Sequence, residues 1–258
     1  MKVLLVGGSG MVGTVITPYL KEHHSLRVLD VQPPSAEGVE YVEGSITDPG
    51  TLKVALDGCD SFINLVMKGP QGGASTEQSF PLIISNYEVN TLGLHLLLYT
   101  AQGLGIRRGV HTSTMSVHYR GRTWYGQEED VAFDTASVYG LTKSLGEVIC
   151  AYFARWFDMN IIGLRITGPR PRERFLDERR QRPAGFEQSK GPDGAGPVFA
   201  TDEEDLAAAY ISALEAVQVG HGRYDAVFIA GDEDESNHNL SKARRLLGWE
   251  PRSQRYLY

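Results

Sequence analysis

The sequence has few cysteines, no basic block and no long apolar run. Its two cysteines, Cys59 and Cys150, lie far apart in a chain of 258 residues, so we expect neither a disulfide framework nor a cysteine-based metal site. The formal net charge is −7, from 25 basic and 32 acidic residues, which argues against a nucleic-acid-binding surface. No apolar run approaches the roughly 20 residues that span a bilayer, so no membrane partner is expected.

The histidines and the N-terminus exclude further classes. The seven histidines have no metal-ligand spacing, and we expect no metal site. Met1 and Lys2 lead straight into an apolar run that we predict to be a core strand, so this N-terminus does not resemble a cleaved secretion signal, and a cytoplasmic location is expected. With 41% hydrophobic residues, the chain can bury one large core, or one main domain with a small lobe.

A glycine-rich loop, residues 7–13, follows the first apolar run and precedes an amphipathic stretch. Glycines at such a point let a pyrophosphate approach backbone N–H groups and the positive end of a helix. The loop is a GxxGxxG variant of the dinucleotide-binding fingerprint. The cofactor contacts predicted here are Gly7, Gly10, Met11, Val12 and Gly13.

The second apolar run, residues 26–30, ends in Asp30, about 20 residues beyond the loop. A carboxylate there accepts hydrogen bonds from the adenosine ribose and repels the 2′-phosphate of NADP. Residues 31–34 offer no arginine or lysine for that phosphate. Asp30 therefore favours NAD as the cofactor; the alternative is that it only caps a turn.

Apolar runs alternate with helical patterns along most of the chain, which predicts an α/β fold with a doubly wound parallel Rossmann sheet. Leucines at helical spacing predict a helix over 86–104, and a similar pattern predicts another over 137–157. We predict an NAD-binding domain over 1–166 and a small C-terminal substrate-binding lobe over 167–258, with elements that complete the sheet. The predicted strands lie near residues 2–6, 26–30, 39–43, 61–66, 108–113, 160–165 and 224–229.

Irregular stretches at 67–80, 116–136 and 167–197 follow predicted strands, where open α/β sheets bind their ligands. The last stretch is expected to form a mobile lid or a small lobe. A guanidinium group can grip a carboxylate in two places, and we choose Arg174 as the arginine that orients an acidic substrate. A solvated charged loop is the alternative for most of its six arginines, which are Arg170, Arg172, Arg174, Arg179, Arg180 and Arg182.

Tyr139 and Lys143 lie one helical turn apart in the predicted helix 137–157. A cation beside a phenol favours the phenolate, which can take a hydroxyl proton while hydride leaves. Lys143 can also hydrogen-bond the nicotinamide ribose. The predicted strand near 108–113 ends in three hydroxyl residues. We expect Thr114 to hold the reacting oxygen, whereas Thr112 and Ser113 are expected to satisfy local backbone groups.

These motifs make the chain resemble an extended short-chain dehydrogenase/reductase of the NAD-dependent epimerase/dehydratase superfamily, over most of residues 1–170. Asn90 matches the helix-four asparagine of that family, and residues 164–169 resemble its LRxxxxGP strand end. The resemblance implies that Asn90 organises backbone and water around Lys143. Ser45, Ile46, Leu65 and Asn90 complete the expected cofactor contacts.

Within the superfamily, sugar-nucleotide dehydratases carry Thr-Asp-Glu where this chain has Thr112-Ser113-Thr114, so dehydration is not expected. Sugar-nucleotide epimerases are usually longer, because a C-terminal lobe must hold the nucleoside diphosphate. Segments 231–237 and 241–251 are similar to uronate dehydrogenases, which oxidise a free hexuronic acid at C1 with NAD. Those enzymes typically follow the catalytic serine with Asn-His, where this chain has Met115 and Ser116.

The sequence thus predicts an NAD-dependent oxidoreductase that oxidises a free sugar or sugar acid at C1 to a lactone, by means of Tyr139, Lys143 and Thr114. The expected substrate contacts are Met115, Ser116, Thr167 and Arg174. An epimerase that retains NAD while acting on a sugar nucleotide is the first alternative, and a noncatalytic NAD-sensing protein is the second. The resemblance also implies a homodimer that pairs through helices 86–104 and 137–157.

Overall fold

The computed structural model describes residues 1–69, 78–180, 199–220 and 223–252. Its centre is a seven-stranded sheet in the order β3-β2-β1-β4-β5-β6-β9, in which every neighbouring pair is parallel. The predicted α/β Rossmann-type fold is confirmed. The strands are β1 (Lys2–Val6), β2 (Ser25–Asp30), β3 (Glu40–Glu43), β4 (Ser61–Asn64), β5 (Arg108–Thr114), β6 (Asn160–Ile166) and β9 (Tyr224–Ile229).

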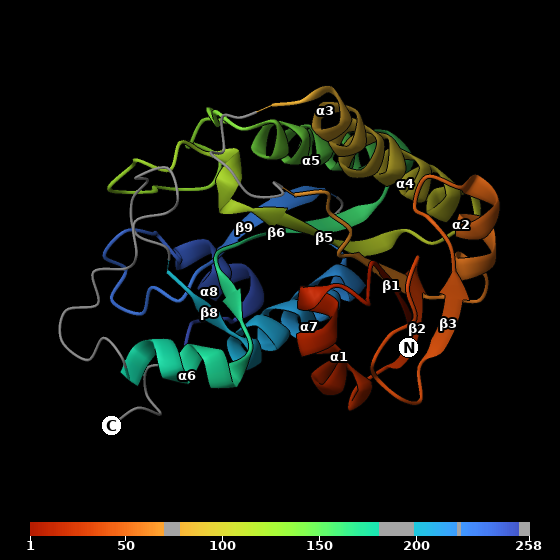
Figure 1. Ribbon diagram of the computed structural model, residues 1–258, viewed down its shortest axis with the longest axis horizontal. Coiled ribbons are helices and arrows are strands. Elements are labelled where there is room, and N and C mark those ends of the chain that lie inside the picture. The colour runs from red at the N-terminus through yellow and green to blue at the C-terminus, as the bar shows by residue number, and fades with distance from the viewer. Residues whose placement is uncertain (70–77, 181–198, 221–222, 253–258) are drawn as a thin grey trace.

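Helices cover both faces of this sheet (Figure 1). One face carries α1 (Met11–Lys21), α7 (Glu203–Val219) and α8 (Ser241–Leu247), and the other carries α2 (Pro49–Leu56), α3 (Phe80–Tyr87), α4 (Leu94–Gly103) and α5 (Val138–Phe157). Strand β1 shows why its apolar run is continuous. Val3 and Leu5 pack into one core, whereas Leu4 and Val6 pack into the other, because successive side chains of a strand point to opposite faces.

The helical stretch predicted to begin at residue 86 begins earlier, at Phe80. The Ser79 hydroxyl accepts a hydrogen bond from the N–H of Leu82 at 3.4 Å, and Pro81 lies in the first turn, both of which favour a helix start. A π-helical turn over Glu88–Gly93 then joins α3 to α4. Helix α5 matches its predicted range closely, with Ser137 capping it by accepting from the N–H of Gly140 at 3.0 Å.

Residues beyond 166 contribute to the main body of the fold. Strand β9 completes the sheet and α7 covers one face of it. The stretch predicted as irregular at 167–197 contains a short strand, β7 (Pro169–Arg170), which pairs with β8 (Thr201–Asp202), and a helix, α6 (Arg172–Arg180). Its remainder lies outside the described residues, and the domain boundary at residue 166 stays a prediction.

Candidate functional site

The glycine loop turns from β1 directly into α1. Gly10 occupies the N-cap with no side-chain cap, and the first helical bond runs from the N–H of Thr14 to the carbonyl of Gly10 at 2.8 Å. The N–H groups of the first turn are therefore available to an anion at the end of the helix. A Cβ at Gly10 would lie 3.3 Å from the carbonyl oxygen of Gly7 and near little else, so this side of the loop is open.

Two other glycines let the loop pack closely. Gly7 has φ of +82°, and a Cβ there would lie 2.7 Å from a methyl carbon of Val66. At Gly13 a Cβ would lie 2.3 Å from the carbonyl oxygen of Gly8. Both positions exclude larger residues, as a pyrophosphate-binding turn requires. This open, tightly built cradle fits the phosphates of a dinucleotide.

Asp30 ends β2 beside this loop. One carboxylate oxygen accepts from the N–H of Ser9 at 3.0 Å, and the other accepts from the N–H of Gln32 at 3.2 Å. Asp30 therefore does cap a turn, but each oxygen keeps a further lone pair for the hydroxyls of a ribose. Capping of a turn and binding of the ribose are therefore compatible roles for Asp30.

Three further predicted cofactor residues lie near the ends of neighbouring strands. The N–H of Gly44 donates to the carbonyl of Asp30 at 3.0 Å, which brings Ser45 and Ile46 to the edge that carries Asp30. The N–H of Leu65 donates to the carbonyl of Val6 at 2.8 Å, so Leu65 lies behind the glycine loop. The structure thus gathers these residues along one edge of the sheet; their contacts with NAD stay predictions.

Thr114 and Tyr139 come together from β5 and α5. The Tyr139 phenol is partly buried and donates to the Sδ atom of Met67 at 3.6 Å. Burial raises the pKa of Tyr139 to about 12, and the neighbouring Thr114 hydroxyl acts in the opposite direction. In the protein alone the loss of hydration therefore outweighs the effect of the Thr114 hydroxyl. That Lys143 lowers the pKa of Tyr139 stays a prediction.

Lys143 lies one turn along α5 from Tyr139 and is 2% exposed. Burial lowers the pKa of its ammonium group to about 8, although Cys150 and Glu147 act to raise it. Within the described part of the chain, no hydrogen bond or ion pair reaches this group. Burial of a charged group is costly, so Lys143 fits a site in which the hydroxyls of a bound ribose accept hydrogen bonds from its ammonium group.

Asn90 organises backbone beside α5, as the resemblance implies for this residue, and its role toward water around Lys143 stays a prediction. Its amide nitrogen donates to the carbonyl of Lys68 at 3.0 Å and to the hydroxyl of Thr142 at 3.0 Å, and its oxygen accepts from the N–H of Lys68 at 2.8 Å. Asn90 therefore fixes the segment after β4 against α5. It reaches Thr142, the neighbour of Lys143, and not Lys143 itself.

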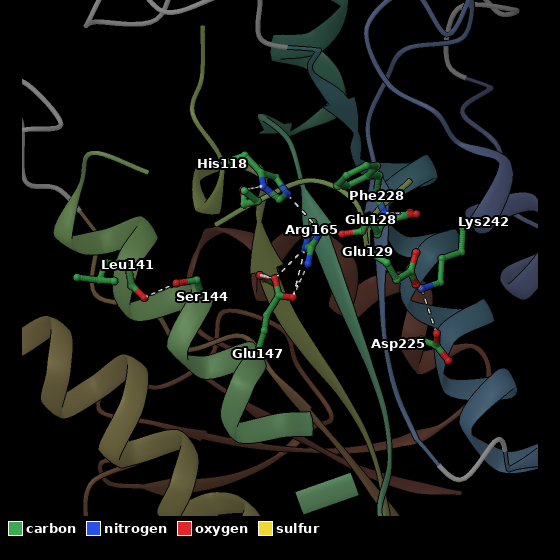
Figure 2. Close-up of polar contacts among 12 residues, drawn as sticks. His118, Glu128, Glu129, Leu141, Ser144, Glu147, Arg165, Asp225, Phe228 and Lys242 are labelled. Carbon is green, nitrogen blue, oxygen red and sulfur yellow. Dashed lines mark hydrogen bonds and ion pairs between the residues drawn. The ribbon is translucent and has the colours of Figure 1, made fainter. Parts of the chain in front are cut away.

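A buried ion pair that the sequence did not predict joins α5 to β6 (Figure 2). Glu147 on α5 accepts from the Arg165 guanidinium on β6, with Nε at 2.9 Å and Nη2 at 2.8 Å, and from the Ser113 hydroxyl at 2.5 Å. Glu147 follows Lys143 by one helical turn, and this spacing in the sequence could have indicated that Glu147 lies near the site. Its partner on β6 could not be deduced from spacing.

The same arginine holds the stretch after β5. Its Nη1 donates to the carbonyl of Glu128 at 3.0 Å and lies 3.2 Å from Nε2 of His118 (Figure 2). Burial lowers the pKa of His118 to about 4, so this imidazole is neutral and can accept from Arg165 while its Nδ1 donates to the carbonyl of Ala132 at 2.7 Å. His118 is thus a packed residue.

The other two hydroxyls of β5 are satisfied internally, as expected, but by side chains and not by backbone groups. Thr112 lies 2.7 Å from the Tyr210 hydroxyl, and Ser113 binds Glu147. Of the three, Thr114 alone lies beside Tyr139. Its hydroxyl also accepts from the N–H of Ser116 at 3.1 Å.

The predicted substrate residues fall into two groups. Met115 and Ser116 begin a 3-10 turn directly after Thr114. Thr167 hydrogen-bonds the carbonyl of Phe199 and joins the segments after β6 and before β8. Arg174, by contrast, is exposed on α6, on the other side of the sheet from α5 in Figure 1, and pairs with Glu178 at 2.8 Å.

Other arginines of that stretch are also paired. Arg170 binds Glu178 at 3.1 Å, Arg180 binds Asp177 at 3.1 Å, and Arg172 binds Asp202. Arg182 lies outside the described residues. The described arginines thus support the alternative of a charged surface, and no observation brings Arg174 to the site.

The chain matches the family described as the NAD dependent epimerase/dehydratase family over residues 3–181. A 3 beta-hydroxysteroid dehydrogenase/Delta 5→4-isomerase of Mycobacterium tuberculosis is 31% identical over 153 residues, which cover 57% of this chain but only 41% of that protein. A uronate dehydrogenase of Pseudomonas putida is 27% identical over 183 residues, covering 68% of this chain and 63% of that protein. The chain thus spans less than two thirds of the length of either relative.

A solved structure of a short-chain dehydrogenase/reductase superfamily protein from Agrobacterium tumefaciens, with bound NAD, is similar throughout. The TM-score is 0.76 at 21% identity, and the match covers 98% of this chain and 93% of that one. At this identity the likeness shows the fold alone. In the part of the chain that the structure describes, no helix has both the length and the apolar character needed to cross a bilayer. Because the family match covers well over half of the sequence, the chain belongs to the NAD dependent epimerase/dehydratase family, and its cofactor is NAD.

Proposed function

We propose that the protein is an NAD-dependent dehydrogenase that oxidises a free sugar or sugar acid, converting C1 of an aldose or uronate to a lactone. The observation that carries this proposal is that Thr114 and Tyr139 come together from β5 and α5, with the buried Lys143 one helical turn along α5 from Tyr139. This group lies at the edge of the sheet where the glycine loop and Asp30 also lie. A phenol, a hydroxyl and a cation together suit proton removal from a substrate hydroxyl.

Each side chain has a separate role in the proposed reaction. Tyr139 takes the proton of the substrate hydroxyl, Thr114 holds the same oxygen by a hydrogen bond, and Lys143 binds the ribose and stabilises the phenolate. Bound NAD supplies the carbon that accepts the hydride and a positive ring near the phenol. Since burial raises the pKa of Tyr139 to about 12, the ionised base depends on such neighbouring positive charge.

The end of β5 supports oxidation over dehydration. Elimination of water needs an acid and a base beside the sugar carbon. Thr112 and Ser113 carry no carboxyl group and are already bound to Tyr210 and Glu147. The substrate class is supported by the uronate dehydrogenase relative, whose name states its activity.

The test is NADH formation, followed by absorbance, with NAD and a panel of free aldoses together with galacturonate and glucuronate. UDP- and GDP-sugars and a 3β-hydroxysteroid serve as competing substrate classes. Absorbance that rises with a free sugar or uronate supports the proposal. A nucleotide sugar that is isomerised without net NADH, or a steroid oxidised in preference to all sugars, contradicts it.

We also propose a homodimer that pairs through α4 and α5. These helices pack against each other and expose several large apolar side chains, which a monomer leaves in contact with water. They are Tyr99 on α4 and Val148, Tyr152 and Trp156 on α5. We propose further that residues 167–258 contain a substrate-binding lobe. We also propose a cytoplasmic location, which the two unpaired cysteines support.

A further inference from the structure

Met67 is the residue that contacts the phenol of the proposed base. The Tyr139 hydroxyl donates to its Sδ atom at 3.6 Å, and Met67 is 50% exposed, so its side chain is accessible from solvent. It stands in the segment that leaves β4 at the ligand-binding edge of the sheet. Neither its residue type nor its position in the sequence predicts a contact with Tyr139.

The backbone around Met67 is held from two sides. Val66 packs so closely on the glycine loop that a Cβ at Gly7 would lie 2.8 Å from its backbone nitrogen. Lys68 exchanges two hydrogen bonds with Asn90, at 2.8 and 3.0 Å. Met67 therefore lies on a fixed strip of chain between the cofactor loop and α5, where the reactive end of a dinucleotide and a substrate must meet.

The tip of the Met67 side chain lies against Gly69. A Cβ at Gly69 would lie 2.5 Å from the Cε methyl of Met67, so the absence of a side chain at Gly69 gives this methyl its space. A thioether is flexible and only a weak hydrogen-bond acceptor. A sugar hydroxyl is a stronger partner for the phenol and can displace the sulfur without loss.

We propose that Met67 is a specificity-determining residue of this enzyme. In the free protein its sulfur occupies the position beside the Tyr139 phenol that the reacting hydroxyl takes, and with substrate bound its side chain forms an apolar wall against the group next to the reacting carbon. This inference rests on the proposed dehydrogenase function. It predicts that the site accepts only substrates with a small substituent at that neighbouring carbon.

The test compares Met67→Ala with Met67→Leu. Leucine keeps the volume and apolar character and removes the sulfur, whereas alanine removes the wall; both changes are at a half-exposed side chain, so neither leaves a buried cavity. The measurement is kcat/KM with a free aldose or uronate and with its 2-O-methyl derivative. We expect Met67→Ala to shift this ratio toward the derivative by about 10-fold or more, as removal of pocket methylenes does, and Met67→Leu to keep it. An unchanged ratio in Met67→Ala overturns the proposal.

A second measurement needs no substrate. Tetranitromethane nitrates accessible tyrosines, and the rate at Tyr139 can be followed by peptide mass spectrometry, with Tyr119, which is 57% exposed and lies outside α4 and α5, as an internal control. Met67→Ala should speed nitration of Tyr139 several-fold, with no change at Tyr119, and Met67→Leu should not. If the unaltered protein oxidises no sugar, the proposed function fails. Nitration then decides separately whether Met67 covers the Tyr139 phenol. Equal nitration rates at Tyr139 in all three proteins would show that it does not, and would overturn the inference.

Discussion

Ser113 donates a 2.5 Å hydrogen bond to Glu147, and this bond joins the two elements that carry the catalytic groups. Ser113 precedes Thr114 on β5, and Glu147 follows Lys143 by one turn of α5. Arg165 binds the same carboxylate from β6. The buried Glu147 carboxylate thus ties the strand that carries Thr114 to the helix that carries Lys143.

Removal of the Glu147 charge should destabilise the protein. Glu147→Gln leaves the Arg165 guanidinium buried without its counter-ion, which typically costs about 3–5 kcal/mol of unfolding free energy. Ser113→Ala removes one bond to a charged group and should cost about 1.5–3 kcal/mol. Urea unfolding measures both. The double variant Glu147→Leu/Arg165→Met should recover much of the loss, and if it is less stable than Glu147→Gln, the buried charge is not the cause.

Tyr139→Phe should lower kcat by about 10²–10⁴-fold, the usual contribution of a general base. Binding of NAD, measured by fluorescence titration, should remain within a few-fold of the unaltered protein. Tyr87→Phe, at an exposed position at the end of α3, is the control and should leave kcat unchanged. Retention of most turnover by Tyr139→Phe would show that another group takes the proton.

Lys143 should make stability depend on pH. Its folded pKa is about 8, below its ordinary value of 10.5, so between these values the unfolded chain binds more protons and stability rises with pH. Lys143→Met removes this burial cost and should stabilise the protein at pH 7 by up to about 3 kcal/mol, while it abolishes turnover. Urea unfolding of both proteins at several pH values should show the difference shrink as pH rises from 8 to 10.5. A constant difference would contradict the lowered pKa.

Asp30→Ala should weaken NAD binding by about 10-fold or more, because hydrogen bonds from the ribose to a charged acceptor are lost. The preference for NAD over NADP should fall at the same time, since no carboxylate then repels a 2′-phosphate. Fluorescence titration with both dinucleotides measures this. Asp57→Asn, at an exposed turn after α2, is the control, and equal effects of the two changes would refute the assignment.

Val148→Glu and Trp156→Glu should each dissociate the proposed homodimer, because a charge in an apolar interface must be desolvated. Light scattering after size exclusion would then give the monomer mass of 28.4 kDa. Val54→Glu on α2, exposed to a similar degree as Val148, should leave the dimer intact. A monomer in the unaltered protein would disprove the pairing of α4 and α5.

The sequence by itself determined the architecture and most of the cofactor site, because these depend on local order along the chain. Alternate burial of Val3 and Leu4 requires a strand covered on both faces, and the glycine loop requires close backbone packing between β1 and α1. Tyr139 and Lys143 share a face because one helical turn separates them. Such relations need no knowledge of distant contacts.

Only the tertiary structure decided how the site is completed, because partners distant in sequence set its geometry and electrostatics. Burial raises the pKa of Tyr139 where a neighbouring cation alone would lower it, and Met67 reaches that phenol across 72 residues of sequence. Glu147 finds Arg165 on a strand whose position follows from the sheet order, and Arg174 pairs with Glu178 on the far side of the sheet from α5. Hydration and long-range packing carry no signature in residue spacing, so these contacts could not be deduced from the sequence.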